Sequence, residues 1–180
     1  MKKEKEYFEL TIEELQSLGQ WAADCAERSL SIYENMEKND TRPRQAIRAI
    51  REFVTNGKRT NSLRKMALEA YRASWETKDR AASAAAKAAG LAAASAYTHP
   101  FKDIHQAKHI LGPAAYSAFA IELLQNADPI VGEQQLEWAV DKANPDIAGL
   151  LKKMPEHNSG GKRINQLFHI LDWGIRNKFK

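Results

Sequence analysis

The chain has 180 residues, of which 43% are hydrophobic and 28% are charged, and its formal net charge is +4. These fractions are typical of globular domains and exclude a disordered or fibrous protein, and a chain of this length buries about two-thirds of its unfolded surface in one core. Alanine, the best helix former, supplies 28 residues, whereas the β-branched residues Val, Ile and Thr together supply only 21, which excludes a β-sandwich or a β-barrel.

Helix-start signals divide the first part of the chain into several predicted amphipathic helices. Thr11 and Glu14 have the spacing of a capping box, in which each side chain satisfies a backbone N–H of the other residue. The helix that follows is expected to end near Lys38. Pro43 fits the first turn of a second predicted helix, and Asn61 and Asp79 are expected to cap a third and a fourth.

The segment 81–96 has an unusual composition, because it contains 11 alanines and one glycine. Small side chains let helix backbones approach one another, so this composition favours a central helix with neighbours packed on several sides. It does not predict a membrane span, since alanine contributes little transfer free energy and Lys87 interrupts the segment.

Turn residues divide the second half of the chain into further predicted helices. The helix over about 103–126 contains Gly112-Pro113, which predicts a kink or a break. Residues 132–143 are predicted to be helical, with an interruption at Asn144-Pro145 before 146–153 continue, and a final helix covers about 163–178. Together the elements predict an all-α fold, a compact bundle of six or seven helices around the alanine-rich central helix. We expect residues 1–180 to form a single domain, with a C-terminal loop and helix at 158–180.

The charges of the first half are unevenly distributed. The first 40 residues carry 5 basic and 10 acidic side chains, whereas the next 40 carry 11 basic and 4 acidic ones. Arg44, Arg48 and Arg51 lie on one face of the second predicted helix. This basic stripe would bind either a phosphate backbone or the acidic side chains of the first helix. Pairing within the fold is favoured because the signs and the stripe positions match. We therefore expect Asp24 or Glu27 to pair with Arg44 or Arg48.

Two histidines have a spacing that is able to chelate a metal ion. His105 and His109 lie on one face of a predicted helix, and His99 or Asp103 would supply a further ligand for zinc or nickel. However, Gln106 stands where the H-E-x-x-H metalloprotease pattern places its general base. Surface or hydrogen-bonded histidines are therefore favoured, and we expect no metal and no other cofactor.

Other features argue against an enzyme and against a membrane protein. The single cysteine, Cys25, lies on the apolar stripe of the first predicted helix, where a cysteine is usually a small buried hydrophobe. No glycine-rich phosphate-binding motif occurs. No apolar run approaches the roughly 18 residues of a membrane span, and the N-terminus lacks the apolar stretch of a signal peptide. The sequence thus predicts a soluble, cytoplasmic protein without catalytic activity.

Several short motifs follow one another in a characteristic order. They are WAADCAE at 21–27, RPRQAI at 42–47, the alanine-rich helix continued to His109, HILGPAAY at 109–116 and, more faintly, MPEH at 154–157. Over roughly residues 8–157, this pattern resembles the helical immunity proteins of bacterial polymorphic toxin systems, the immunity-protein-five-like family. The chain departs from the family pattern at Tyr97, where a histidine is expected, and by extra residues around 100–108.

The resemblance implies a small cytoplasmic protein that protects its producer by binding and neutralising a cognate protein toxin. From the charge pairing and the lack of a long apolar run, we expect no specific nucleic acid and no membrane as partner. Together with the charge pattern, the resemblance makes Arg42, Arg44 and Tyr116 candidate partner-binding residues. Helix-start pairing and core packing are their alternative roles. Two other functions stay open, namely a nucleic-acid-associated protein that uses the arginine-rich second and third helices, and a metal-dependent enzyme that uses the histidines.

Overall fold

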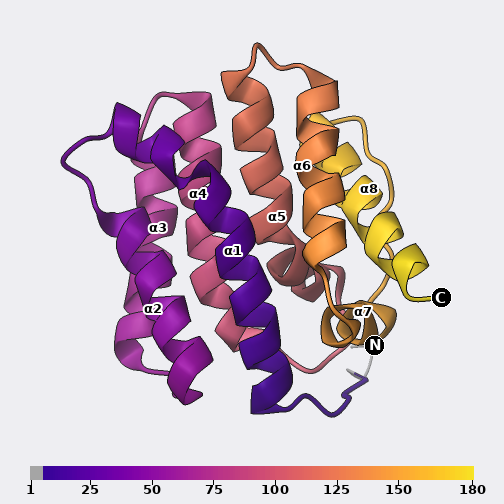
Figure 1. Cartoon of the computed structure of the whole chain (residues 1–180). Coiled ribbons are helices and arrows are strands. Elements are labelled where there is room, and N and C mark those ends of the chain that lie inside the picture. Colours follow the sequence, from indigo (N-terminus) through magenta and orange to yellow (C-terminus); the bar gives the residue numbers. More distant parts are fainter. Residues whose placement is uncertain (1–5) are drawn as a thin grey trace, which may run out of the picture.

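The computed structural model describes residues 6–180, and within that range the chain forms eight α-helices, one short 3₁₀ helix and no β-strand (Figure 1). The all-α prediction is confirmed. The α-helices exceed the predicted six or seven because the short α7 is a separate element, set off by Asn144. The elements are α1 Ile12–Met36, α2 Arg42–Asn56, α3 Asn61–Glu76, α4 Arg80–Ala94, η1 Ser95–Tyr97, α5 Ile104–Leu124, α6 Pro129–Lys142, α7 Pro145–Lys152 and α8 Arg163–Lys178.

Local capping sets the helix starts. The predicted capping box of α1 is confirmed, since the Glu14 N–H donates to Thr11 Oγ1 at 3.1 Å and the Thr11 N–H donates to Glu14 Oε2 at 2.8 Å. Asp79 caps α4 as expected, accepting from the Ala82 N–H at 2.7 Å. The prediction for α3 was wrong by one residue. Thr60 is its cap, because its extended backbone lets Oγ1 accept from the helix, and Asn61 is already helical.

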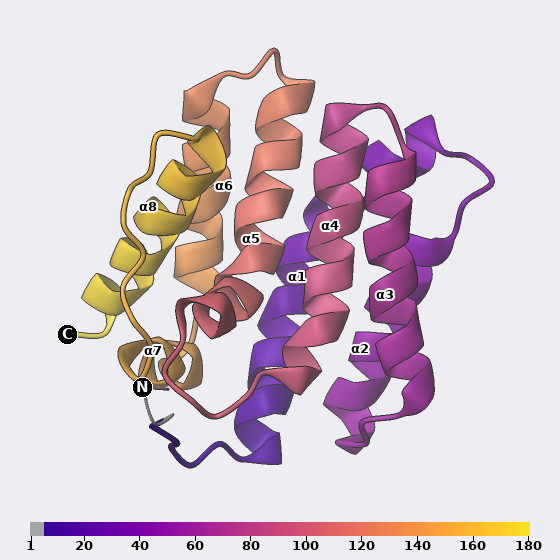
Figure 2. The same ribbon diagram turned by 180° about the vertical axis from the view of Figure 1, so that it is seen from behind.

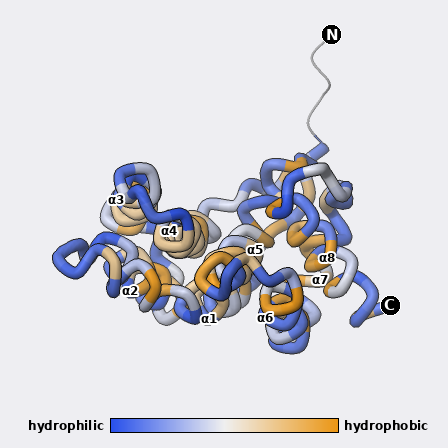
Figure 3. Tube along the Cα trace, turned by 90° about the horizontal axis from the view of Figure 1, so that it is seen from above, coloured by the Kyte–Doolittle hydropathy of each residue, from blue (hydrophilic) through white to orange (hydrophobic). Residues whose placement is uncertain are grey.

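The alanine-rich helix α4 lies at the centre of the bundle, as predicted. It packs against α1, α2, α3 and α5, and eleven of its fifteen residues are buried. Viewed end-on, α3 and α4 form one layer over α2 and α1, and α5 to α8 continue the bundle on one side (Figure 3). Gly90 shows how closely the backbones approach, because a Cβ there would lie 3.2 Å from the carbonyl oxygen of Ala67 on α3.

The Gly112-Pro113 pair bends α5 without breaking it. The helix is continuous from Ile104 to Leu124, and its first turns point away from the axis of the rest (Figure 2). Proline lacks the N–H that would continue the hydrogen-bond ladder, which is a common cause of such kinks. A Cβ at Gly112 would lie 2.6 Å from Leu91 Cδ1, so the bend also brings α5 close to α4.

Ala89→Leu tests the close packing around α4. Ala89 is fully buried against α1, α2 and α3 residues, so the larger side chain is expected to overpack the core and lower the free energy of unfolding by about 1–3 kcal/mol. Urea unfolding measures the change. Ala94→Leu is the control on the same helix, because Ala94 is only half-buried and lines a surface pocket. Equal stability of wild type and Ala89→Leu would contradict the packing.

The C-terminal helix α8 packs on α5 and α6 rather than standing apart from the bundle. Leu167 and Leu171 of α8 belong to the same buried cluster as Leu18 of α1. The loop before α8 is also held, since the ring of His157 stacks on that of Phe168 with centroids 5.0 Å apart. Residues after 158 therefore contribute to the core that α1 and α5 share.

Candidate partner-binding groove

Three neighbouring pockets follow the outward face of α4, which lies between α3 and α5 (Figure 2). The first pocket, of about 300 Å³, shares Tyr71 and His109 with the middle one, of about 240 Å³. The middle pocket shares Lys87 and Tyr116 with the third, of about 290 Å³. We call the three together the α4 groove. Its lining includes Arg64, Leu68 and Tyr71 of α3, Lys87, Leu91 and Ala94 of α4, and His105, Lys108, His109 and Tyr116 of α5.

Tyr116, one of the three predicted partner-binding residues, lies in this groove. Its ring packs edge-to-face on Phe168, with centroids 5.9 Å apart, and Lys87 Nζ lies 5.0 Å from the Tyr116 ring centroid. Burial raises the pKa of Tyr116, so its phenol is neutral at physiological pH. The structure thus gives Tyr116 a packing role in the lining of the groove, and a contact with a partner stays a prediction.

The wall formed by α3 carries both basic and apolar side chains. Arg64, Leu68, Tyr71 and Trp75 are spaced by three or four residues, so they lie on one face of the helix. Leu68 is 54% exposed and Trp75 is 72% exposed. The Trp75 ring centroid lies 6.3 Å from that of Tyr71, which places the indole beside the groove. Exposed large apolar side chains next to a basic groove are typical of interaction surfaces.

Among the described residues that line the groove, only Asp79 carries a carboxylate. Between Asp79 and Glu122 the sequence contains one carboxylate residue, Asp103. Asp79 and Asp103 both cap helices, and Asp103 Oδ1 accepts from the His105 N–H at 2.6 Å. Among the described residues, no carboxylate forms an ion pair with Arg64, Lys87 or Lys108. The groove is therefore electropositive.

The histidines of the metal hypothesis gather at one end of the groove. His105 and His109 line the middle pocket, and His99 and His109 line the first one. Burial lowers the pKa of His109, and nearby His99 and His105 lower it further, so its imidazole is neutral at pH 7. Asp103 caps α5, and His99 stacks on Phe101. Within residues 6–180, no three His, Cys, Asp or Glu side chains are arranged to hold a metal ion.

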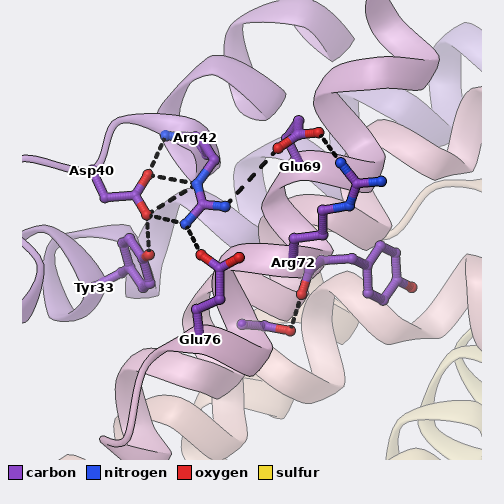
Figure 4. A network of polar contacts seen from close by, with 8 residues as sticks. Tyr33, Asp40, Arg42, Glu69, Arg72 and Glu76 are labelled. Carbon is purple, nitrogen blue, oxygen red and sulfur yellow. Dashed lines mark hydrogen bonds and ion pairs between the residues drawn. The ribbon is translucent and has the colours of Figure 1, made fainter.

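Arg42 lies away from the α4 groove, in a polar network that joins α1, α2 and α3 (Figure 4). Its guanidinium contacts Asp40 at 2.6 Å and Glu76 at 2.5 Å. Tyr33 Oη donates to Asp40 Oδ2 at 2.7 Å. The hydrogen bonds from Arg42 lower the pKa of Asp40 to about 2, and desolvation raises the pKa of Tyr33. Arg42 therefore fixes the start of α2, and a contact with a partner stays a prediction.

Arg44 belongs to a second set of ion pairs, between α1 and α2. Its Nε donates to Glu34 Oε1 at 2.6 Å, and its Nη1 lies 3.6 Å from Glu27 Oε1. Arg51, rather than Arg48, pairs with Asp24 and also contacts Glu27. The predicted pairing of the acidic first helix with the basic second helix is confirmed. Most of the basic stripe is thus engaged inside the fold, and a partner-binding role for Arg44 also stays a prediction.

Two further properties bear on function. Cys25 is 1% exposed, and burial raises the pKa of its thiol, so it is the small buried hydrophobe that the sequence predicts. None of the helices in the described part of the chain is both long and apolar enough to cross a bilayer.

Sequence reasoning identified Tyr116 but not the α4 groove around it. Leu68, Trp75 and Lys108 were not among the candidates, since each is unremarkable in its own helix. The sequence feature that could have indicated a basic surface is the stretch between Asp79 and Glu122, which contains one carboxylate residue.

A family model matches most of the chain. The model of the Imm-5 like putative immunity protein family matches residues 9–146, which include α1 to α6 and the α3, α4 and α5 faces of the groove. The match ends before the MPEH motif at 154–157, which the sequence pattern had included. No curated protein and no solved structure matches the chain significantly. Because the match covers more than half of its length, the chain belongs to the Imm-5 like putative immunity protein family.

Proposed function

We propose that this protein neutralises a cognate bacterial toxin, in the cytoplasm of the cell that produces both, by forming a stoichiometric complex with it. The observation that carries the proposal is the family match over residues 9–146. Immunity proteins of this kind act on a protein partner, and the α4 groove supplies a surface suited to one. Arg64 lines the groove and the exposed Trp75 lies beside it, and arginine and tryptophan are among the residue types that dominate the binding energy of protein interfaces.

Neutralisation by binding needs no turnover, only a complex that covers an active site or another essential surface of the toxin. Protection should therefore reach a plateau when the two proteins are equimolar. An enzyme that modifies the toxin would instead protect at a small fraction of the toxin concentration. The stoichiometry of protection separates these two mechanisms.

The experiment begins by identifying a toxin gene beside the gene of this protein, and it uses the toxin which that gene encodes. Coexpression is expected to restore growth, and titration of purified protein against toxin activity should reach its endpoint at a ratio of one to one. The two proteins should also coelute in size-exclusion chromatography. A toxin of unrelated sequence is the control, and its activity should not change. Protection without a physical complex, or complete protection at a ratio far below one, would contradict the proposal.

A further inference from the structure

We infer that the α4 groove is the surface that binds the toxin, and that it takes an acidic segment of the toxin that also carries an apolar side chain. This inference rests on the proposed function, and it adds the location of the interface and the chemistry of the partner.

Charge complementarity is the first argument. Most of the arginines outside the groove form ion pairs with carboxylates, as in the contacts of Arg163 with Glu122 at 2.9 Å and of Arg42 with Asp40 at 2.6 Å. By contrast, Arg64, Lys87 and Lys108 stand on three different helices around one groove and form no ion pair with the described residues. A segment with several carboxylates would be attracted to all three and held in one orientation.

The orientation of α3 explains why the groove stays basic. Glu69 and Glu76 lie on the face of α3 that meets Arg42, at 3.9 Å and 2.5 Å from its guanidinium (Figure 4). The face with Arg64, Leu68 and Tyr71 lines the groove. The glutamates of α3 therefore form ion pairs within the protein, whereas its basic and apolar side chains on the other face line the groove.

The apolar side chains favour a polypeptide over a nucleic acid. Leu68, 54% exposed, lines the same pocket as Arg64, and Trp75, 72% exposed, lies one helical turn beyond Tyr71. A duplex presents mainly its phosphate backbone, which offers no apolar group that would cover a leucine, whereas protein interfaces join aromatic anchors with arginines at their centre. Single-stranded RNA, whose bases stack on aromatic side chains, is the competitor that the test includes. Where Ala84 and Ala94 line the groove, α4 presents only methyl groups, so a side chain of the toxin has room to enter between the walls.

The test measures the affinity of the toxin for two pairs of matched variants. Arg64→Glu with Lys108→Glu reverses two exposed charges on opposite walls of the groove. Lys65→Glu with Arg48→Glu makes the same change in net charge at exposed positions that do not line the groove. We expect the groove pair to weaken binding at least about a hundredfold and the control pair less than about threefold, with binding of the wild type decreasing as salt rises.

A second pair of variants tests the apolar anchor. Trp75→Ala is expected to weaken binding about tenfold or more. Trp173→Ala, on α8 outside the groove and 64% exposed, should leave the affinity unchanged. Both tryptophans are exposed, so neither change should alter the melting temperature, and loss of folding does not account for the difference.

The outcomes distinguish this inference from the proposed function. If the wild type binds the toxin and both groove variants bind equally well, the location of the interface is wrong and the proposed function stands. If the wild type does not bind the toxin, the proposed function itself fails.

A short single-stranded RNA is the other probe. Tight binding of that RNA at physiological salt, lost in the variant with Arg64→Glu and Lys108→Glu, would assign the groove to nucleic acid instead and overturn the inference.

Discussion

Replacing Arg163 by alanine is expected to lower the free energy of unfolding by about 3–5 kcal/mol, because it leaves a buried carboxylate without its partner. Glu122, at the end of α5, is 2% exposed, and Arg163 Nη2 contacts its Oε2 at 2.9 Å. The same guanidinium donates to the carbonyl oxygen of Pro129 at 3.0 Å and contacts Glu133 at 3.2 Å. One side chain at the start of α8 thus links the end of α5 to the start of α6.

Urea unfolding at neutral pH measures the effect, and a second ion pair supplies the control. Arg72 is 61% exposed and contacts Glu69 at 2.6 Å, so Arg72→Ala should cost less than about 0.5 kcal/mol. Adding Glu122→Met to Arg163→Ala should recover most of the lost stability, because the unpaired charge is then gone. Similar losses in the two arginine variants would contradict the role assigned to burial.

Asp40→Asn is expected to cost roughly 2 kcal/mol at pH 6 and almost nothing near pH 2. The hydrogen bonds from Arg42 hold the pKa of Asp40 at about 2 in the folded protein, below its ordinary value of 3.8. A carboxylate with a lowered pKa stabilises the fold above its unfolded pKa. This stabilisation is lost as the pH falls from about 4 to about 2, since the proton then binds the unfolded chain first.

Urea unfolding across this pH range gives the measurement. The stability of the wild type should fall more steeply between pH 4 and pH 2 than that of Asp40→Asn, and the two curves should converge at the acid end. Asp141→Asn is the control, because Asp141 is 73% exposed and lies 3.7 Å from its partner Lys142. Parallel curves for wild type and Asp40→Asn would show that the network in Figure 4 does not depend on the charge of Asp40.

The helices could be predicted from the sequence wherever their limits depend on local chemistry. The Thr11 capping box, Pro43 in the first turn of α2 and Asp79 before α4 act within a few residues, so spacing alone identifies them. The effect of Pro113 could not be decided in this way, since a kink and a break begin with the same missing hydrogen bond. In the structure α5 is continuous through Pro113, and Gly112 packs closely against Leu91 of α4.

The groove depends on tertiary contacts, which limits what the sequence can predict about it. The pairing of α1 with α2 was predictable because opposite charges lie on consecutive helices. Arg64, Lys87 and Lys108 are far apart in the chain, and they line one surface only because α4 packs between α3 and α5. The exposure of Trp75 likewise depends on which face of α3 is covered.

The alanines of α4 also determine how much conformational freedom is lost in folding and in binding. Alanine and glycine lose no rotamer freedom on burial, whereas each buried leucine or isoleucine loses about 0.5–1 kcal/mol. Eleven residues of α4 are buried, and all but Leu91 are alanine or glycine, so the helix becomes ordered at a small entropic cost. Where Ala84 and Ala94 line the groove, α4 likewise has no side-chain conformations to select when a partner arrives. The side chains of the walls and the longer α4 side chains, such as Lys87 and Leu91, still have to be ordered.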